Sequence, residues 1–353
     1  MRLNRSTSAA ERRLYNCGNH GRSVAFLAAL LAVLWGAVLL SLRAGSYNTP
    51  VGELVKGIFG LAADKKVNIV VRANRLPRIC TAIVAGAGLG ASGCVLQAVL
   101  RNPLASASTL GVSQGASFGA AFAIIVLDLG GSVLSGALIP LLAFAGSMGV
   151  ALVILALARL KQISPEGIVL AGVAISSMLT GATTLIQYFA DEVQLTTLVF
   201  WTFGDLGSTS WADIRIMAAV VALVGAYFML HRWDYNALLG GSETATSVGV
   251  NVRRLTMVNM ILCCLTASTV VSYIGLISFI GLVAPHIVRQ VVGSNHAYLI
   301  PGSMLAGATL LLLGDLLSRV VVSPIVLPIG AITSFLGGPL FLYLLFKGNK
   351  KSC

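Results

Sequence analysis

Ten apolar stretches with few or no charged residues, most of them about 20 residues long, constrain this chain more than any other feature. A run of about 18 apolar residues can cross the hydrocarbon core of a bilayer as a helix. With 57% hydrophobic and 10% charged residues, the composition excludes an ordinary soluble domain. We predict an all-α polytopic membrane protein whose transmembrane helices cover residues 23–42, 79–100, 105–127, 133–158, 167–190, 216–230, 255–273, 276–292, 297–322 and 325–346.

The basic residues that produce a net charge of +12 are concentrated in alternate loops and at both ends of the chain. This is the positive-inside pattern, which predicts that both termini of this multi-pass membrane protein are cytoplasmic. The charge therefore indicates membrane orientation and no nucleic-acid partner. We expect residues 22–347 to form the transmembrane domain, between a basic cytoplasmic tail that can be disordered (1–21) and a short second cytoplasmic tail (348–353).

A polar segment, 238–254, separates two apolar stretches and predicts a short cytoplasmic helix. Ser242 is placed to cap its amino end, and Glu243 falls in the first turn, where the helix dipole favours an anion. Gly249 supplies a stop signal. The chain has no G-x-x-x-x-G-K-[ST] phosphate loop, so we do not expect it to hydrolyse ATP. The helix suggests an attachment point for a separate motor.

Four arginines on the external side depart from the charge rule. Arg72, Arg75 and Arg78 follow the first span, and Arg319 lies near the external end of the ninth. Single cations can extend to an interface, and long loops cross membranes regardless of charge. Alternatively, the four form a cationic rim that binds carboxylates of a docking partner.

Few ionisable residues lie within the predicted spans. Asp315 stands four residues before Arg319, so the two side chains can pair along one helix face. Carriers driven by protons or sodium use charged groups at mid-membrane, and no chain of such groups is visible here. The six cysteines show no metal-binding spacing, so we predict no metal site.

Two short turns lie on the predicted cytoplasmic side. One contains Asn102, Pro103 and Leu104, and the other contains Ser164 and Pro165. Proline fixes the backbone and disfavours helix before it, so each turn holds its residues in a defined place. The turns are either simple connectors or parts of a gate.

Six motifs, taken in order, resemble those of one transporter family. They are RLPR at 75–78, LQAVLRNPLA at 96–105, LGVSQG at 110–115, LAGVA at 170–174, GLISFIGLVAPHIVR at 275–289 and LPIG at 327–330. Each motif alone is weak, but their order and spacing cover almost the whole chain. The chain resembles the permease subunits of type II ABC importers, the FecCD-like family that carries ferric siderophores, haem and cobalamin.

The resemblance implies ten spans per subunit and a pathway enclosed by two permease copies, here a homodimer. It also implies two cytoplasmic ATPase subunits, which bind ATP and Mg, and a soluble extracytoplasmic binding protein. The permease is then a transport subunit without catalytic residues or cofactors of its own.

The resemblance also implies roles for particular residues. Arg75, Arg78 and Arg319 would meet acidic residues of the binding protein. The segment from Glu243 to Gly249, which has the spacing E-x-A-x-x-x-G, would couple the permease to the ATPase. Asn102 and Leu104 match gate positions. Two departures stand out: Ser106-Ala107 replaces a frequent Asp-Pro, and Pro165-Glu166 occupies the second turn, which weakens its gating role. The coupling set is Ser242, Glu243, Ala245 and Gly249, and the gate set is Asn102, Pro103, Leu104, Ser164 and Pro165.

The resemblance implies ATP-driven import of an iron chelate, haem or a corrinoid across the inner (cytoplasmic) membrane by alternating access. The alternative is an ion-coupled secondary transporter that acts without an ATPase. No residue selects among the three substrate classes.

Overall fold

The computed structural model describes residues 9–44, 50–130, 135–161 and 165–348, and this part of the chain is helical, without a β-strand. Ten of its helices correspond one to one to the predicted spans, which confirms the all-α polytopic fold. They are α1 (Ala9–Arg43), α4 (Leu76–Val99), α5 (Val112–Ala121, continued by η2, Phe122–Val126), α6 (Ser135–Lys161), α7 (Pro165–Tyr188), α9 (Trp211–Leu230), α12 (Val252–Ile274), α13 (Ile280–Val292), α14 (His296–Val320) and α15 (Ile329–Gly348).

Seven of the described helices are long and apolar enough to cross a membrane, and α5 with η2, α13 and α15 are shorter apolar helices. The backbone explains two of the short ones. Residues 105–111 form turns that end at Gly111 in the left-handed region, so α5 begins later than predicted. The predicted split near Gly275 is confirmed, since Gly275 and Phe279 both have positive φ angles. Pro285 lies inside α13, within the span predicted at 276–292.

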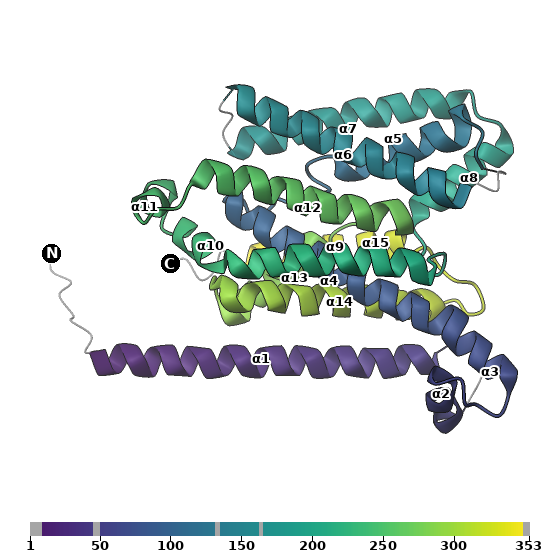
Figure 1. The fold of residues 1–353 in the computed structure, drawn as a ribbon, viewed down its shortest axis with the longest axis horizontal. Coiled ribbons are helices and arrows are strands. Elements are labelled where there is room, and N and C mark those ends of the chain that lie inside the picture. Colours follow the sequence, from purple (N-terminus) through teal and green to yellow (C-terminus); the bar gives the residue numbers. More distant parts are fainter. Residues whose placement is uncertain (1–8, 45–49, 131–134, 162–164, 349–353) are drawn as a thin grey trace.

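Six shorter helices lie at the two ends of the bundle. At one end lie α10 (Arg232–Leu238) and α11 (Ser242–Ser247); at the opposite end lie α2 (Val51–Ile58), α3 (Lys65–Ile69), η1 (Val70–Arg75) and α8 (Glu192–Phe203) (Figure 1). Helix α8 lies between the helices of the fifth and sixth predicted spans. Helix α1 starts at the α11 end and runs the length of the bundle (Figure 1). It is already helical from Ala9, unlike the disorder considered for residues 1–21, because Ala, Glu, Arg and Leu at 9–14 favour helix.

Helix α4 forms the centre of the bundle and packs against α9, α12, α13 and α14. Glycines permit its close contact with α14: a Cβ atom at Gly86 would overlap the carbonyl group of Gly307, and one at Gly90 would overlap that of Ser303. The packing of α5 against α6 is similar, since a Cβ at Gly115 would lie 2.6 Å from the carbonyl oxygen of Gly146 in α6. These small residues let helix backbones touch, which is how helices associate in lipid.

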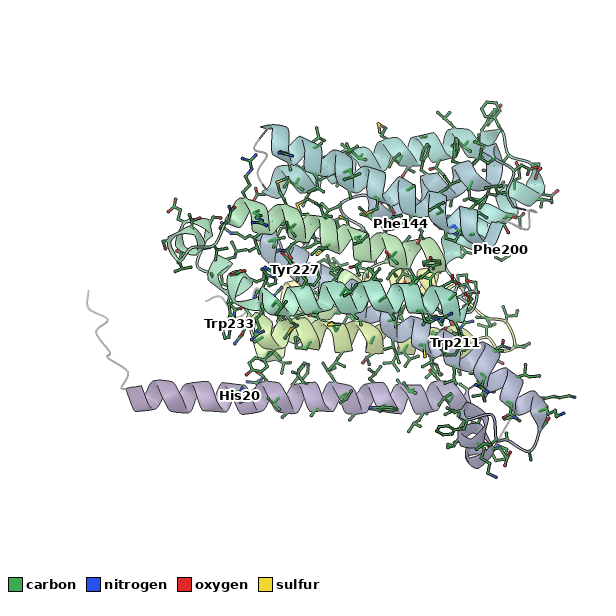
Figure 2. The ribbon with its side chains drawn as sticks, in the orientation of Figure 1. His20, Phe144, Phe200, Trp211, Tyr227 and Trp233 are labelled. Carbon is green, nitrogen blue, oxygen red and sulfur yellow. The ribbon has the colours of Figure 1, made fainter. Side chains whose placement is uncertain are left out.

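Large apolar side chains also cover the outside of the bundle. Examples are Trp35 on α1, Leu170 on α7, Leu223 on α9 and Phe335 on α15, which are 61%, 69%, 74% and 79% exposed. Such a surface requires lipid or a protein partner around it. Aromatic residues stand at both ends, with Trp233 near α11 and Phe200 and Trp211 at the opposite end (Figure 2). This is the distribution expected at the two membrane–water interfaces.

Candidate functional site

Helix α11 is the predicted polar helix, and its amino end differs from the prediction in one respect. Gly241, with φ 103° and ψ 163°, is the N-cap residue, and no side chain caps this helix. Ser242 is therefore the first helical residue and not the cap, because the left-handed glycine turns the chain one position earlier. Glu243 lies in the first turn, as predicted, and is exposed.

The carboxyl end of α11 closes at Gly249, as predicted. The amide of Gly249 donates to the carbonyl of Thr246 at 3.0 Å, and the amide of Val250 donates to that of Ala245 at 3.0 Å. With φ 92° at Gly249, these two bonds form a Schellman motif. Ala245 is fully buried beneath the helix, whereas Val248 is 67% exposed. One face of α11 is thus fixed to the bundle and the other is presented to solvent.

The first predicted gate turn touches α11 directly. Arg101 adopts a left-handed conformation, with φ 48°, and its Nη1 donates to the hydroxyl of Ser242 at 3.1 Å. The side chain of Asn102 accepts a hydrogen bond from the amide of Leu104 at 2.9 Å, which closes the turn over Pro103. Ser106 then bonds Thr109 reciprocally, through Ser106 N to Thr109 Oγ1 at 2.9 Å and Thr109 N to Ser106 Oγ at 3.2 Å.

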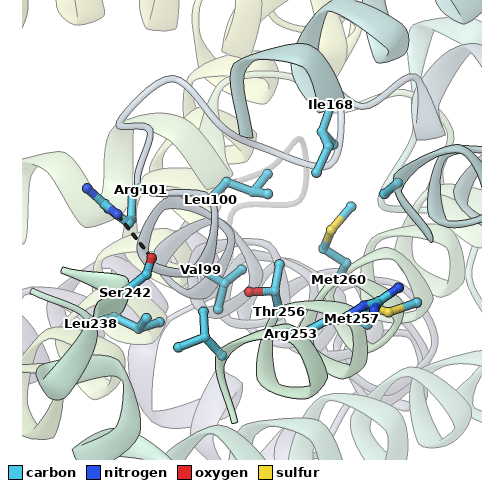
Figure 3. Close-up of a pocket in the computed structure, with 12 residues that line it drawn as sticks. Val99, Leu100, Arg101, Ile168, Leu238, Ser242, Arg253, Thr256, Met257 and Met260 are labelled. Atoms are coloured by element: carbon cyan, nitrogen blue, oxygen red, sulfur yellow. Dashed lines mark hydrogen bonds between the residues drawn. The ribbon is translucent and has the colours of Figure 1, made fainter. Parts of the chain in front are cut away.

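A cavity of about 360 Å³ lies where this turn meets α11 (Figure 3). Arg101 and Ser242 stand on one side of it, and Ile168 of α7 reaches it from the other (Figure 3). Ile168 lies three residues after Pro165, the first residue of α7, so the start of α7 is brought to the same end as the first turn. Ser164 lies outside the described residues.

Helix α10 connects α11 to the bundle through buried polar contacts that the sequence analysis did not find. The hydroxyl of Tyr235 donates to Oδ1 of Asn259 in α12 at 2.6 Å, and both residues are fully buried. Asn236 accepts a hydrogen bond from the amide of His296, at the start of α14, at 2.8 Å. Burial raises the pKa of Tyr235, so its phenol stays protonated and keeps donating. A lone tyrosine or asparagine in an apolar sequence gives little signal of such a pairing.

At the opposite end, two of the three arginines with a predicted docking role, Arg78 and Arg319, contact one carboxylate. Nε of Arg78 donates to Oδ1 of Asp315 at 2.6 Å, and Nη2 of Arg319 lies 3.0 Å from Oδ2 of the same carboxylate. The predicted pairing of Asp315 with Arg319 is thus confirmed. Arg78 also has a weaker ionic contact, at 3.5 Å, with the more exposed Asp205, which the sequence analysis did not find.

Arg75, together with Arg319, holds the end of α1. Nη1 of Arg75 donates to the carbonyl of Leu42 at 2.6 Å, and Nη1 of Arg319 donates to the carbonyls of Ser41 and Ala44 at 3.3 and 3.2 Å. Cations at a helix carboxyl end satisfy its free carbonyl groups and its dipole. The three guanidinium groups therefore all have structural partners within the chain.

Among the residues that the structure describes, no three His, Cys, Asp or Glu side chains gather closely enough to hold a metal ion. The adjacent Cys263 and Cys264 are buried in the packing of α12.

Comparison with known proteins gives consistent matches over nearly the full length of the chain. The model of the FecCD transport family matches residues 31–347. An ABC transporter permease protein of Methanocaldococcus jannaschii is 47% identical, over 94% of this chain and 96% of its own. The hemin transport system permease protein HmuU of Yersinia pestis is 34% identical, over 92% and 96%. A solved structure of an ABC transporter of the metal-chelate type, in an inward-facing conformation, superposes with a TM-score of 0.80 at 30% identity and covers 91% of this chain and 98% of its own.

Proposed function

Because this chain belongs to the FecCD transport family, we propose that it is the membrane-spanning permease subunit of an ATP-driven importer in the inner membrane. The end that carries α11 is then cytoplasmic. Arg101, Arg232, Arg253, Arg254 and Arg289 all lie towards that end, in agreement with the positive-inside pattern.

The attachment of α11 is the observation that carries the proposal. Its outer face is exposed, its inner face is buried at Ala245, and Arg101 bonds it to the turn over the bundle. Through α10 it is also fixed to α12 and α14. A rigidly held helix can transmit a displacement to the bundle, whereas a loose loop would absorb it. We assign Ser242, Glu243, Ala245 and Gly249 to coupling with an ATPase subunit, which supplies the bound ATP and Mg.

The gate assignment rests on the same contacts. Asn102, Pro103 and Leu104 form a closed turn at the α11 end, and a movement of α11 would reach them through Arg101. Pro165 begins a helix that reaches the neighbouring cavity. We propose that both turns, the second including Ser164, border the cytoplasmic exit of the pathway.

The arginine cluster is proposed to receive the extracytoplasmic binding protein. Arg75, Arg78 and Arg319 stand at the end opposite α11 beside two carboxylates, so the cluster keeps an excess of one positive charge. Arg78 and Arg319 retain side-chain exposures of 15% and 10%. An acidic side chain on the binding protein would neutralise the remaining positive charge of the arginine cluster.

The working importer is proposed to contain two copies of this permease and two ATPase subunits. The exposed apolar surfaces of α7 and α15, which include Leu170 and Phe335, are candidates for the contact between copies. The substrate is proposed to be a metal chelate or a tetrapyrrole, meaning a ferric siderophore, haem or a corrinoid, in keeping with the relative that is named for hemin transport.

Reconstitution of the chain in proteoliposomes tests this function. We expect uptake of a ferric chelate, haem or a corrinoid only when the partner ATPase, ATP and the loaded binding protein are all present. The chain alone, given a proton or sodium gradient, should transport nothing. Gradient-driven uptake without an ATPase would overturn the proposal in favour of a secondary transporter.

A further inference from the structure

A second cavity, of about 230 Å³, lies at the α11 end of the bundle, beside the first gate turn. Its wall includes Arg101 from the turn after α4, Arg289 from α13 and Ser294 from the connection to α14. Leu239 and Pro103 contribute apolar surface. We propose that this cavity binds a phosphate-bearing anion.

The charge of the lining carries the proposal. Two guanidinium groups line the cavity, and none of its lining residues is an aspartate or glutamate. Four ion pairs occur in the described part of the chain, and they involve other arginines and lysines. The side-chain bond of Arg289 goes to a neutral group, from Nη2 to Oε1 of Gln97 at 2.9 Å. Arg289 is thus a partly buried cation without a carboxylate partner in this region.

Such a cation is costly to keep away from water, since burial of an unpaired charge is unfavourable unless an opposite charge is supplied. Gln97 cannot supply it, and its own amide is engaged with the carbonyl of Leu282 at 3.3 Å. A guanidinium group has five N–H donors in a planar fork that matches phosphate oxygens. A tetrahedral anion placed between Arg101 and Arg289 could accept from both, with the Ser294 hydroxyl as a third donor.

Two sources could supply this anion. Basic cavities between transmembrane helices on the cytoplasmic side bind the headgroups of acidic phospholipids. Free phosphate in the cytosol offers the same oxygens. In either case an anion bound in the cavity affects α11, because Arg101 lines this cavity and also bonds Ser242 in α11. Binding therefore stiffens the connection between the turn and α11.

The test uses the full-length chain in neutral detergent and compares it with Arg289→Gln, which removes the charge but keeps an amide donor. Arg215→Gln is the matched control, since Arg215 is an exposed arginine at the opposite end, where its Nε bonds the carbonyl of Trp211. The first probe is inorganic phosphate against chloride at equal ionic strength. The second is nanodiscs of phosphatidylglycerol against phosphatidylcholine. The melting temperature is the measured quantity.

We expect at least one probe to raise the melting temperature by roughly 3 °C or more near saturation. Arg289→Gln should lose the shift, and Arg215→Gln should retain it. A shift with phosphate identifies a soluble anion, and a shift with phosphatidylglycerol alone identifies a lipid headgroup. If neither probe gives a shift that depends on Arg289, the proposal is overturned. Should Arg289→Gln fail to fold, Arg101→Gln takes its place, because Arg101 is exposed; a full shift in that variant also overturns the proposal.

Discussion

Arg78 and Asp315, which are 237 positions apart in the chain, form the shortest ion pair among the described residues, with Nε 2.6 Å from Oδ1. The carboxylate is fully buried and also contacts Arg319. This one acidic side chain therefore joins the start of α4 to the end of α14, and through Arg319 to the end of α1.

Replacement of Asp315 with Asn should destabilise the protein strongly. Two guanidinium groups would lose their shared counter-charge, and the loss of one partner of a buried pair costs about 3–5 kcal/mol. The measurement is thermal unfolding in detergent. Asp205→Asn is the control, because that carboxylate is 53% exposed and 3.5 Å from Arg78; its effect should stay below about 1 kcal/mol. Equal effects of the two changes would contradict the central role of Asp315.

Charge reversal at Arg75 together with Arg319 should weaken docking of the binding protein. We expect at least a tenfold loss of affinity, about 1.4 kcal/mol, in a binding assay with the permease–ATPase complex in nanodiscs. Arg72→Glu, an exposed arginine of the same end, is the control and should have a smaller effect.

Because Arg75 and Arg319 also hold the end of α1, the melting temperature of the double variant must be measured alongside its binding. Unchanged docking by a folded double variant would rule out the docking role. A loss of docking that merely follows unfolding would not support it.

Glu243→Lys should uncouple ATP hydrolysis from uptake. The change puts a cation in the first turn of α11, where the helix dipole opposes it by about 0.3–1 kcal/mol, and reverses the charge of the exposed face. We expect ATPase activity to persist while the uptake per ATP hydrolysed falls severalfold. Glu192→Lys is a matched control, since Glu192 is an exposed first-turn glutamate of α8 at the opposite end. Normal coupling in Glu243→Lys would count against the assignment of α11.

Tyr235→Phe tests whether α10 transmits movement. Asn259 would be left buried without its donor, a loss of about 1–3 kcal/mol, and the link from α11 to α12 would loosen. We expect lower thermal stability and a reduced ratio of uptake to ATP hydrolysis. The control is Tyr227→Phe, since Tyr227 is partly buried at the same end and stacks on His231 through its ring. A stability loss with an unchanged ratio would make Tyr235 purely structural.

The helices could be predicted from sequence because lipid imposes a simple rule on apolar length. Each of the ten predicted spans has a helix, and the errors fall at their ends. Residues 105–111 carry no charged side chain, as a span requires, yet the left-handed turn at Gly111 excludes them from α5. Hydropathy indicates which segments can lie in lipid, but it does not indicate where the backbone turns. The Ser242 cap was wrong for the same reason, since glycine conformation is not visible in composition.

The site was predicted only in part, because its contacts are long-range. The Glu243 and Gly249 positions follow from local helix rules and were found in the structure. The Arg101–Ser242 bond joins residues 141 positions apart, and the Tyr235–Asn259 pair crosses from one helix to another. Only the fold brings these groups together, so neither contact has a signature in the sequence.

The contact of α4 with α14 has a consequence for movement. Where Gly86 and Gly90 lie directly on the backbone of Gly307 and Ser303, there are no side chains between the helices that could change rotamer and let one slide past the other. The two helices can therefore be displaced only as one body, and their ends opposite α11 are joined by Arg78 and Asp315. Any opening and closing of a pathway must leave this pair as a fixed frame and tilt the helices that border it.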